Sequence, residues 1–290
     1  MKAAKKAKAS LRLQRDKPLA KEIRRVARAQ IDAACRILAS DEEPRHAVHE
    51  ARKALKKIRA ILRLVAPEFG RKPYRVEKRL FQDAARLLAP LRDAEARVKS
   101  LDALLQLGKL EPGDFSKVRE TLEAVAERLA REANLPKSRA VEILGLARRR
   151  VRRWPLGELE WNDLVKEIRR AYRKGRACLE LYQQEQTPET FHAWRKRVKE
   201  LWYHLRIVED LLPEAVAKQI DLFGEIGEIA GNARDLAMLR ETLSARKADV
   251  ETALLIGEID VRLPELQQSA TERGVRLYAD KPGVFAKRLL

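Results

Sequence analysis

The sequence predicts an all-α fold, made of two homologous antiparallel helical bundles that are related by a pseudo-twofold axis. The first reason is composition, because charged residues make up 36% of the 290 residues and aromatic residues only 5%. Such a balance is typical of long helices. Apolar side chains also recur at helical spacing. The third reason is a duplication, since the motif His49-Glu-Ala-Arg52-Lys53-Ala-Leu-Lys56 returns as His192-Ala-Trp-Arg195-Lys196-Arg-Val-Lys199.

The first half of the chain, residues 18–153, is expected to form helices that are separated by Pro and Gly. Pro44 separates the first helix from the motif helix, and Pro67 and Gly70 end the motif helix, because both residue types interrupt helices. The expected helices cover about residues 18–39, 44–67, 74–89, 93–107 and 115–153, with a candidate interruption at 134–136.

The second half, residues 158–290, repeats this order after a join at Trp154-Pro-Leu-Gly157. A break at Pro188 precedes the second motif helix, and Pro213 ends it. A last helix is expected at about residues 246–268, followed by a tail. The duplication therefore predicts one bundle for each half.

An Arg-Asp pair is the second repeated feature, at Arg92-Asp93 and at Arg234-Asp235. The first pair follows Pro90 and is expected to lie in a turn that starts a new helix. Asp93 would then stand near the helix N-terminus, where a carboxylate accepts backbone N–H groups and meets the positive end of the helix dipole.

The charge of the chain favours an anionic partner. There are 62 Lys and Arg residues against 43 Asp and Glu residues, a formal net charge of +19. Such an excess suits nucleic acid, anionic lipid or polyphosphate, and charge alone does not choose among them. Residues 1–17 form a basic N-terminal arm, which is expected to be mobile, with a docked segment as the alternative.

The cysteines and the hydropathy pattern favour the cytoplasm. Cys35 and Cys178 cannot build a disulfide framework and are read as small core residues, with a bridge between them as the alternative. No stretch reaches the ~18 apolar residues of a membrane span, and the N-terminus lacks the apolar block of a signal peptide. We therefore expect no membrane partner.

Each motif helix carries a cationic stripe beside an apolar one. At about 100° per residue, the cations of each copy fall on one side and the apolar residues centre roughly 120–130° away. The first helix buries Val48, Leu55 and Ile58, and the second buries Phe191, Trp194 and Val198 in this prediction. The cations are His49, Arg52, Lys53, Lys56, Arg59 and Arg63 in the first copy, and His192, Arg195, Lys196, Lys199 and Arg206 in the second.

A linear polyanion is the ligand that such stripes suit. Spaced lysines supply point charges and arginines supply bidentate contacts to phosphate oxygens. The helix before each motif adds further candidates, Arg24 and Arg28 in the first half and Arg169 and Arg173 in the second. The alternative is that the stripes are merely solvated helix faces.

The motif His-x-x-Arg-Lys-x-x-Lys, its second copy and the repeated Arg-Asp pair resemble the CHAD domain, the conserved histidine α-helical domain, over about residues 18–290. This resemblance implies two helical bundles around a basic central cavity that binds inorganic polyphosphate. It implies that the His, Arg, Lys and Lys of both motifs line the cavity, with Arg59 at a further basic position. Trp202 departs from the pattern at the counterpart of Arg59, and Ala237 departs where the first copy has Glu95.

Catalysis and metal binding are poorly supported. The four histidines include no His-Glu-x-x-His pattern, and the cations beside His49 would repel a divalent ion. No Gly-rich phosphate loop, nucleophile with an adjacent base, or acidic cluster for Mg²⁺ is apparent. We therefore expect a non-enzymatic polyphosphate-binding protein without cofactor, in the cytoplasm and associated with polyphosphate granules. Nucleic-acid binding is the alternative, and metal-assisted phosphohydrolysis is a third hypothesis.

Overall fold

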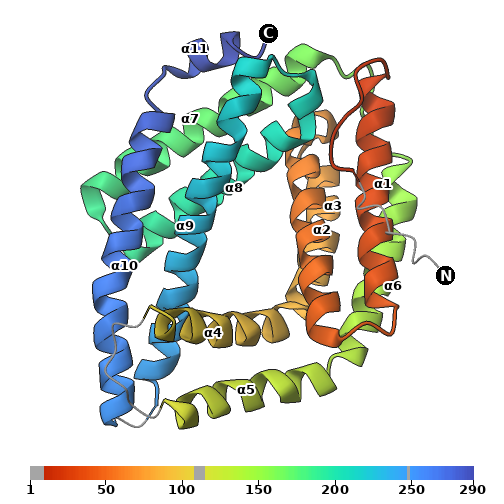
Figure 1. Ribbon diagram of the computed structural model, residues 1–290. Coiled ribbons are helices and arrows are strands. Elements are labelled where there is room, and N and C mark those ends of the chain that lie inside the picture. Colours follow the sequence, from red (N-terminus) through yellow and green to blue (C-terminus); the bar gives the residue numbers. More distant parts are fainter. Residues whose placement is uncertain (1–9, 108–114, 247–248) are drawn as a thin grey trace, which may run out of the picture. The chain divides into compact units, whose positions relative to one another are not determined.

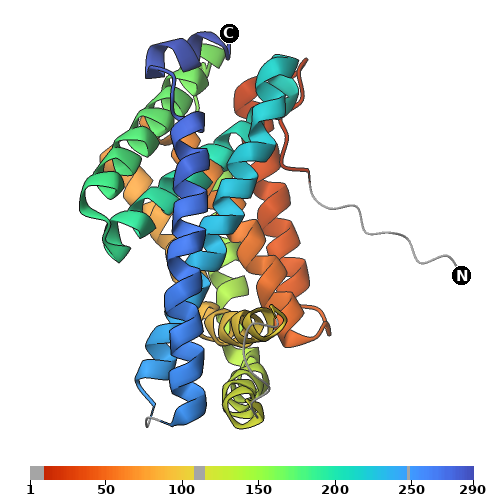
Figure 2. The same cartoon turned by 60° about the vertical axis from the view of Figure 1, so that its left-hand side comes forward.

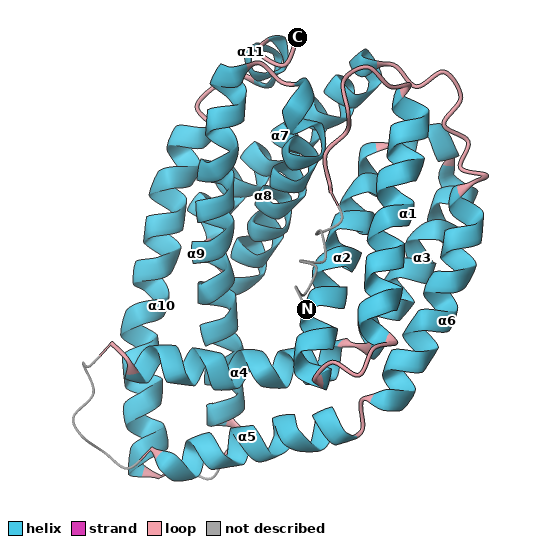
Figure 3. Ribbon diagram, turned by 45° about the vertical axis from the view of Figure 1, so that its right-hand side comes forward, coloured by secondary structure: helices cyan, strands magenta, loops and turns pink. Residues whose placement is uncertain are grey.

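The structure is a computed structural model that describes residues 10–107, 115–246 and 249–290. Every regular element in these ranges is a helix (Figure 3), which confirms the all-α prediction. The chain divides into two compact units. The first unit contains the chain up to Leu88, Asn134–Glu167 and Tyr203–Leu212, and the second contains Ala89–Ala133, Ile168–Trp202 and Pro213–Leu290.

These units do not follow the two sequence halves. Each unit combines segments from both sides of the join at Trp154-Pro-Leu-Gly157, and the helices that bear the second motif and precede it contribute to both units. The assignment of one bundle to residues 18–153 and another to 158–290 therefore stays a prediction.

The first unit is a bundle of four principal helices (Figure 1). In it α1 packs against α2 and α6, and α3 packs against the same two helices. The apolar stripe predicted on α2 forms its core, because Val48, Leu55 and Ile58 are at most 1% exposed. The helices are α1 (Leu19–Leu38), α2 (Pro44–Leu64), α3 (Arg71–Leu87) and α6 (Asn134–Val151), with the 3₁₀ turn η1 (Ala66–Phe69) between α2 and α3.

The start of α2 is set by its cap. The Glu43 carboxylate accepts hydrogen bonds from the backbone N–H groups of Arg45 and His46, at 3.0 and 2.8 Å, and Pro44 fills the first helical position. The carboxylate thus pairs two N–H groups at the helix N-terminus, and the proline has no N–H group that would need a partner there. Gly70, with a φ of 66°, then lets the chain turn so that α3 begins at Arg71, earlier than the expected Tyr74.

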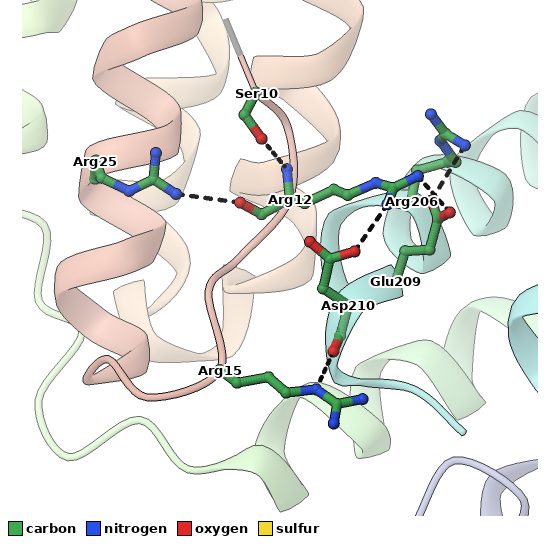
Figure 4. Close-up of polar contacts among 7 residues, drawn as sticks. All are labelled: Ser10, Arg12, Arg15, Arg25, Arg206, Glu209 and Asp210. Atoms are coloured by element: carbon green, nitrogen blue, oxygen red, sulfur yellow. Dashed lines mark hydrogen bonds and ion pairs between the residues drawn. The ribbon is translucent and has the colours of Figure 1, made fainter. Parts of the chain in front are cut away.

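Residues 10–17 of the basic arm are docked, so the expectation of a mobile arm is wrong for this part. Leu13 is fully buried, and its backbone N–H donates to the carbonyl of Ile207 at 2.9 Å. Arg12 forms ion pairs with Asp210 and Glu209, at 2.8 and 2.5 Å (Figure 4). These partners lie almost 200 residues away in the sequence, so the residue pattern of the arm itself could not predict the contacts. Residues 1–9 lie outside the described residues.

The second unit is built around long helices. Here α9 lies beside α10 (Figures 1 and 2), and α4 packs against α5 and α9. One apolar core joins these four helices, with Leu101, Leu122, Leu239 and Leu255 at most 5% exposed. The helices are α4 (Ala89–Leu105), α5 (Ser116–Arg131), α9 (Glu214–Ser244), α10 (Val250–Leu277), α11 (Pro282–Lys287) and the larger parts of α7 (Trp161–Glu185) and α8 (Pro188–Val208), with the 3₁₀ turn η2 (Glu209–Leu211) before α9.

Aromatic side chains join α7 to its neighbours within this unit. Tyr182 of α7 contacts Phe191 of α8, with ring centroids 5.0 Å apart. Tyr172 stacks on Phe285 of α11 at 4.1 Å. The segment expected to be a tail is therefore helical and packed, since α10 continues to Leu277 and α11 follows it.

The Arg-Asp pairs differ from expectation in their local structure. α4 begins at Ala89, so Asp93 lies beyond the first turn and does not cap the helix. Arg234 and Asp235 lie inside the uninterrupted helix α9. Pro90 explains the difference between the copies, because it lacks the N–H group that would continue the hydrogen bonding of α3 into α4.

Candidate anion-binding site

The cations predicted on α2 lie beside its buried stripe, on the partly exposed side of the helix. Lys56 is exposed and the other five are partly buried. Arg52 is anchored, because its Nη1 donates to the carbonyl of Ala85 in α3 at 2.8 Å. We call this set the α2 cluster: His49, Arg52, Lys53, Lys56, Arg59 and Arg63.

Like charges are crowded at one end of the α2 cluster. Burial lowers the pKa of Arg59, and the positive charges of Arg63 and Arg52 lower it further. A guanidinium stays protonated at any physiological pH. The three charges therefore repel each other in the free protein, and an anion placed among them would relieve that repulsion.

The stripe is not as purely cationic as the sequence suggested. Glu50 lies within it, with its Oε1 2.7 Å from Lys53 Nζ and 3.9 Å from His49 Nε2. Burial raises the pKa of Glu50, but Lys53 and His49 together bring it below its ordinary value. The carboxylate therefore stays charged and compensates part of the charge of Lys53.

The second motif helix holds His192, Arg195, Lys196 and Lys199 in the second unit. Burial lowers the pKa of His192 to about 4, together with the positive charges of Lys196, Arg234 and Arg195. His192 is therefore neutral at neutral pH and stands in a positive potential. Arg234, from α9, was not among the predicted site residues.

Glycines of α9 form the surface on which the cations of α8 lie. A Cβ atom on Gly227 would come within 2.6 Å of Lys199 Cε, and one on Gly231 would be 3.7 Å from Arg195 Nη2. Burial lowers the pKa of Lys199, and so does the charge of Arg195. Its ammonium lies 4.7 Å from the centre of the Trp202 ring, a cation–π contact.

The two Arg-Asp pairs meet in the second unit. The Asp235 carboxylate lies 3.7 Å from Arg92 and 3.6 Å from Arg234. Each of these three side chains is at most 35% exposed. Their repetition in the sequence was the signal that could have identified them as site residues. We call the enlarged set the α8 cluster: His192, Arg195, Lys196, Lys199, Arg92 and Arg234.

Arg206 does not belong with the α8 cluster. It lies in the first unit, and its guanidinium is 3.1 Å from Glu209, beside the docked arm (Figure 4). The carboxylate, which also pairs with Arg12, compensates part of its charge. The separation from its motif arises because α8 crosses from one unit to the other after Trp202.

The additional arginines, on the helix that precedes each motif, make contacts away from the motif helices. Arg24 and Arg28 line a shallow groove of about 430 Å³ that is formed by α1, and Arg24 also donates to the carbonyl of Trp154 at 2.8 Å. Arg169 and Arg173 are exposed on α7, and Arg169 Nη2 lies 3.8 Å from a Cβ placed on Gly283 in the first turn of α11. None of these contacts joins them to the motif helices.

In the part of the chain that the structure describes, no three His, Cys, Asp or Glu residues are grouped so that they could hold a metal ion. None of the described helices is long and apolar enough to cross a membrane. Cys35 and Cys178 are partly buried and not bridged.

Comparison with known proteins identifies the family. The CHAD domain matches residues 19–244, so residues 245–290, which the expected range of about 18–290 included, lie beyond the matched stretch. No curated protein sequence matches the chain. The crystal structure of the CHAD domain from the plant Ricinus communis is similar, with a TM-score of 0.75 and 14% identity over 94% of this chain and 96% of that one. This likeness concerns the fold, whereas the sequence match covers most of the chain, which therefore belongs to the CHAD domain family.

Proposed function

We propose that the chain binds inorganic polyphosphate through the α2 cluster and the α8 cluster. The observation that carries the proposal is the crowding of like charges in both copies of the motif. Burial and the charges of Arg63 and Arg52 lower the pKa of Arg59 in one cluster, and a neutral histidine stands among three cations in the other. Packing like charges costs free energy unless an anion completes the site.

A polymer suits the α2 cluster better than a single phosphate. A helix rises 1.5 Å per residue, so the cations from His49 to Arg63 follow roughly 21 Å of its length. This length allows contacts with several successive phosphates. Its lysines and arginines would release counterions on binding, so affinity should fall steeply as salt increases.

We propose further that both clusters bind the same polymer. The resemblance to the CHAD family implies that this polymer lies in a basic channel between two bundles. The protein would hold the polymer without cleaving it, because neither cluster contains a nucleophile with an adjacent base. Cytoplasmic polyphosphate granules would be the place where it acts. Co-localisation with granules in cells would test that location.

The nucleic-acid alternative depends on aromatic rings that can stack on bases. The Trp202 ring lies 4.7 Å from the Lys199 ammonium, and a Cβ on Gly224 of α9 would be 3.0 Å from its Nε1. Trp194 is fully buried. These contacts favour polyphosphate over single-stranded nucleic acid.

Competition binding tests the proposal. Long-chain polyphosphate is titrated against single- and double-stranded DNA at matched charge and physiological salt. We expect polyphosphate to bind more tightly, and Lys196→Glu to weaken it by about tenfold or more through loss of one cation and gain of an anion. Lys78→Glu, on the exposed surface of α3, makes the same charge change outside both clusters and should have little effect.

Three results would contradict the proposal. DNA could bind more tightly than polyphosphate, or Lys78→Glu could weaken binding as much as Lys196→Glu does. Phosphate release that a chelator abolishes would support the phosphohydrolase hypothesis. Circular dichroism of each variant separates loss of the site from loss of the helices.

A further inference from the structure

A cavity of about 710 Å³ lies at the end of α6, in the first unit. Pockets of roughly 300–1,000 Å³ hold small organic ligands in many proteins. The arginines from Arg148 to Arg153 line it, together with one carboxylate, Glu77. No residue of the α2 or α8 cluster takes part in this lining.

The arginines of the cavity are only partly compensated. Arg150 Nε donates to Glu77 Oε1 at 2.6 Å, and Arg148 Nη2 to Asp32 Oδ2 at 3.2 Å. Arg149, Arg152 and Arg153 are exposed, and no described Asp or Glu lies within ion-pair distance of them. Arginines at a helix C-terminus also offset the helix dipole, but the dipole amounts to about half a charge, far less than three uncompensated guanidinium groups.

The floor of the cavity combines aromatic rings with one buried carboxylate. Glu77 is 3% exposed and accepts a hydrogen bond from Trp154 Nε1 at 3.2 Å, so it ties α3 to the end of α6. Phe69 packs edge to face on Trp154, with centroids 5.4 Å apart. Leu146 adds an exposed apolar wall, at 48% exposure. The cavity thus combines an apolar surface with guanidinium groups.

We infer that this cavity is a second, separate ligand site, and that its ligand is a nucleoside polyphosphate. Guanidinium groups bind phosphate oxygens bidentately, and the base and sugar would cover Leu146 and the floor. An inorganic polymer has no apolar part and would leave that surface exposed. The inference does not depend on polyphosphate binding by the two clusters.

The experiment compares ATP with inorganic tripolyphosphate, each titrated into the full-length protein by calorimetry. We expect ATP to bind more tightly than tripolyphosphate. Arg152→Ala with Arg153→Ala should lower ATP affinity by about tenfold or more, because charge-assisted hydrogen bonds are lost. The matched control is Arg128→Ala with Arg131→Ala, which removes two exposed arginines from the last turn of α5.

A second variant separates the nucleoside from the phosphates. Leu146→Ser should weaken ATP by a few-fold and leave tripolyphosphate unchanged, because only the apolar contact is lost. Long-chain polyphosphate binding should stay within about twofold of wild type in both cavity variants. The inference is overturned if ATP and tripolyphosphate bind alike and Leu146→Ser affects neither. It is overturned equally if the arginine variant and its α5 control lower ATP affinity to the same extent, or if ATP does not bind.

Discussion

The titration of His192 gives the sharpest quantitative prediction for polyphosphate binding. In the free protein, the pKa of His192 is about 4, against an ordinary 6.5. Burial lowers it most, and the positive charges of Lys196, Arg234 and Arg195 lower it further. A phosphate among these cations would offset their charge and favour the imidazolium. The pKa of His192 should therefore rise when the polymer binds, so that binding takes up a proton and strengthens as pH falls.

The size of the effect follows from the two pKa values. If bound polymer restores the pKa of His192 from about 4 to 6.5, lowering the pH from about 7 to about 5 should raise affinity by at most ~20-fold. This is an upper limit, because His192 is partly exposed and solvent screens its neighbours. The effect should approach zero above about pH 7.5, where the imidazole is neutral in both states.

The assay is the affinity for long-chain polyphosphate at constant ionic strength, measured for wild type and His192→Gln at each pH. The difference between the two proteins cancels the titration of other groups and of the polymer. His46→Gln, exposed near the start of α2, is the matched control and should retain the wild-type slope. Equal slopes for wild type and His192→Gln would refute the reasoning, because His192 would then take up no proton on binding.

Three other predictions follow from single contacts. Gly227→Ala should displace Lys199 and weaken polyphosphate binding, whereas the control Gly257→Ala, whose Cβ meets nothing within 4 Å, should stabilise α10 by about 0.5–1 kcal/mol in thermal unfolding. Glu50→Gln should tighten polyphosphate binding by about threefold at low salt, because it frees Lys53 from its 2.7 Å ion pair; weaker binding would show that Glu50 positions the lysine. Leu13→Ala should lower the free energy of unfolding by about 3 kcal/mol in urea, since the side chain is fully buried; a change below about 0.5 kcal/mol would contradict docking of the arm.

The sequence predicted the features that depend on residues close together in the chain, namely helix boundaries and the buried face of α2. Pro44 and Gly70 separate helices as expected, and the apolar stripe of α2 is buried as its periodicity required. It could not predict contacts made through space. Arg234 meets His192, and Leu13 meets Ile207, only because the fold brings distant segments together.

The angle of a residue around the helix axis was not enough to predict whether a nearby carboxylate compensates the charge of a cation. Glu50 directly follows His49, yet its long side chain reaches Lys53 and enters the cationic stripe. Arg206 lies on the same side of α8 as the other cations of its motif. However, it follows Trp202, after which α8 belongs to the first unit, and its guanidinium pairs with Glu209. An angular plot places a side chain on a face and does not say which carboxylate it meets.

The glycines of α9 suggest how the fold tolerates a cation at low solvent exposure. Lys199 would meet a Cβ at Gly227, so only glycine lets its aliphatic stem lie flat against the helix while the ammonium reaches the face of Trp202. The ring supplies a partial negative charge beside the ammonium, and the negative charge of Glu228 favours the protonated lysine as well. A carboxylate in place of the ring would neutralise more of the lysine charge and repel an incoming phosphate, whereas the aromatic face stabilises the ammonium without adding a full negative charge. The counterpart of Trp202 in the first copy is Arg59, so the second copy of the motif supplies an aromatic ring at a position where the first copy supplies a cation.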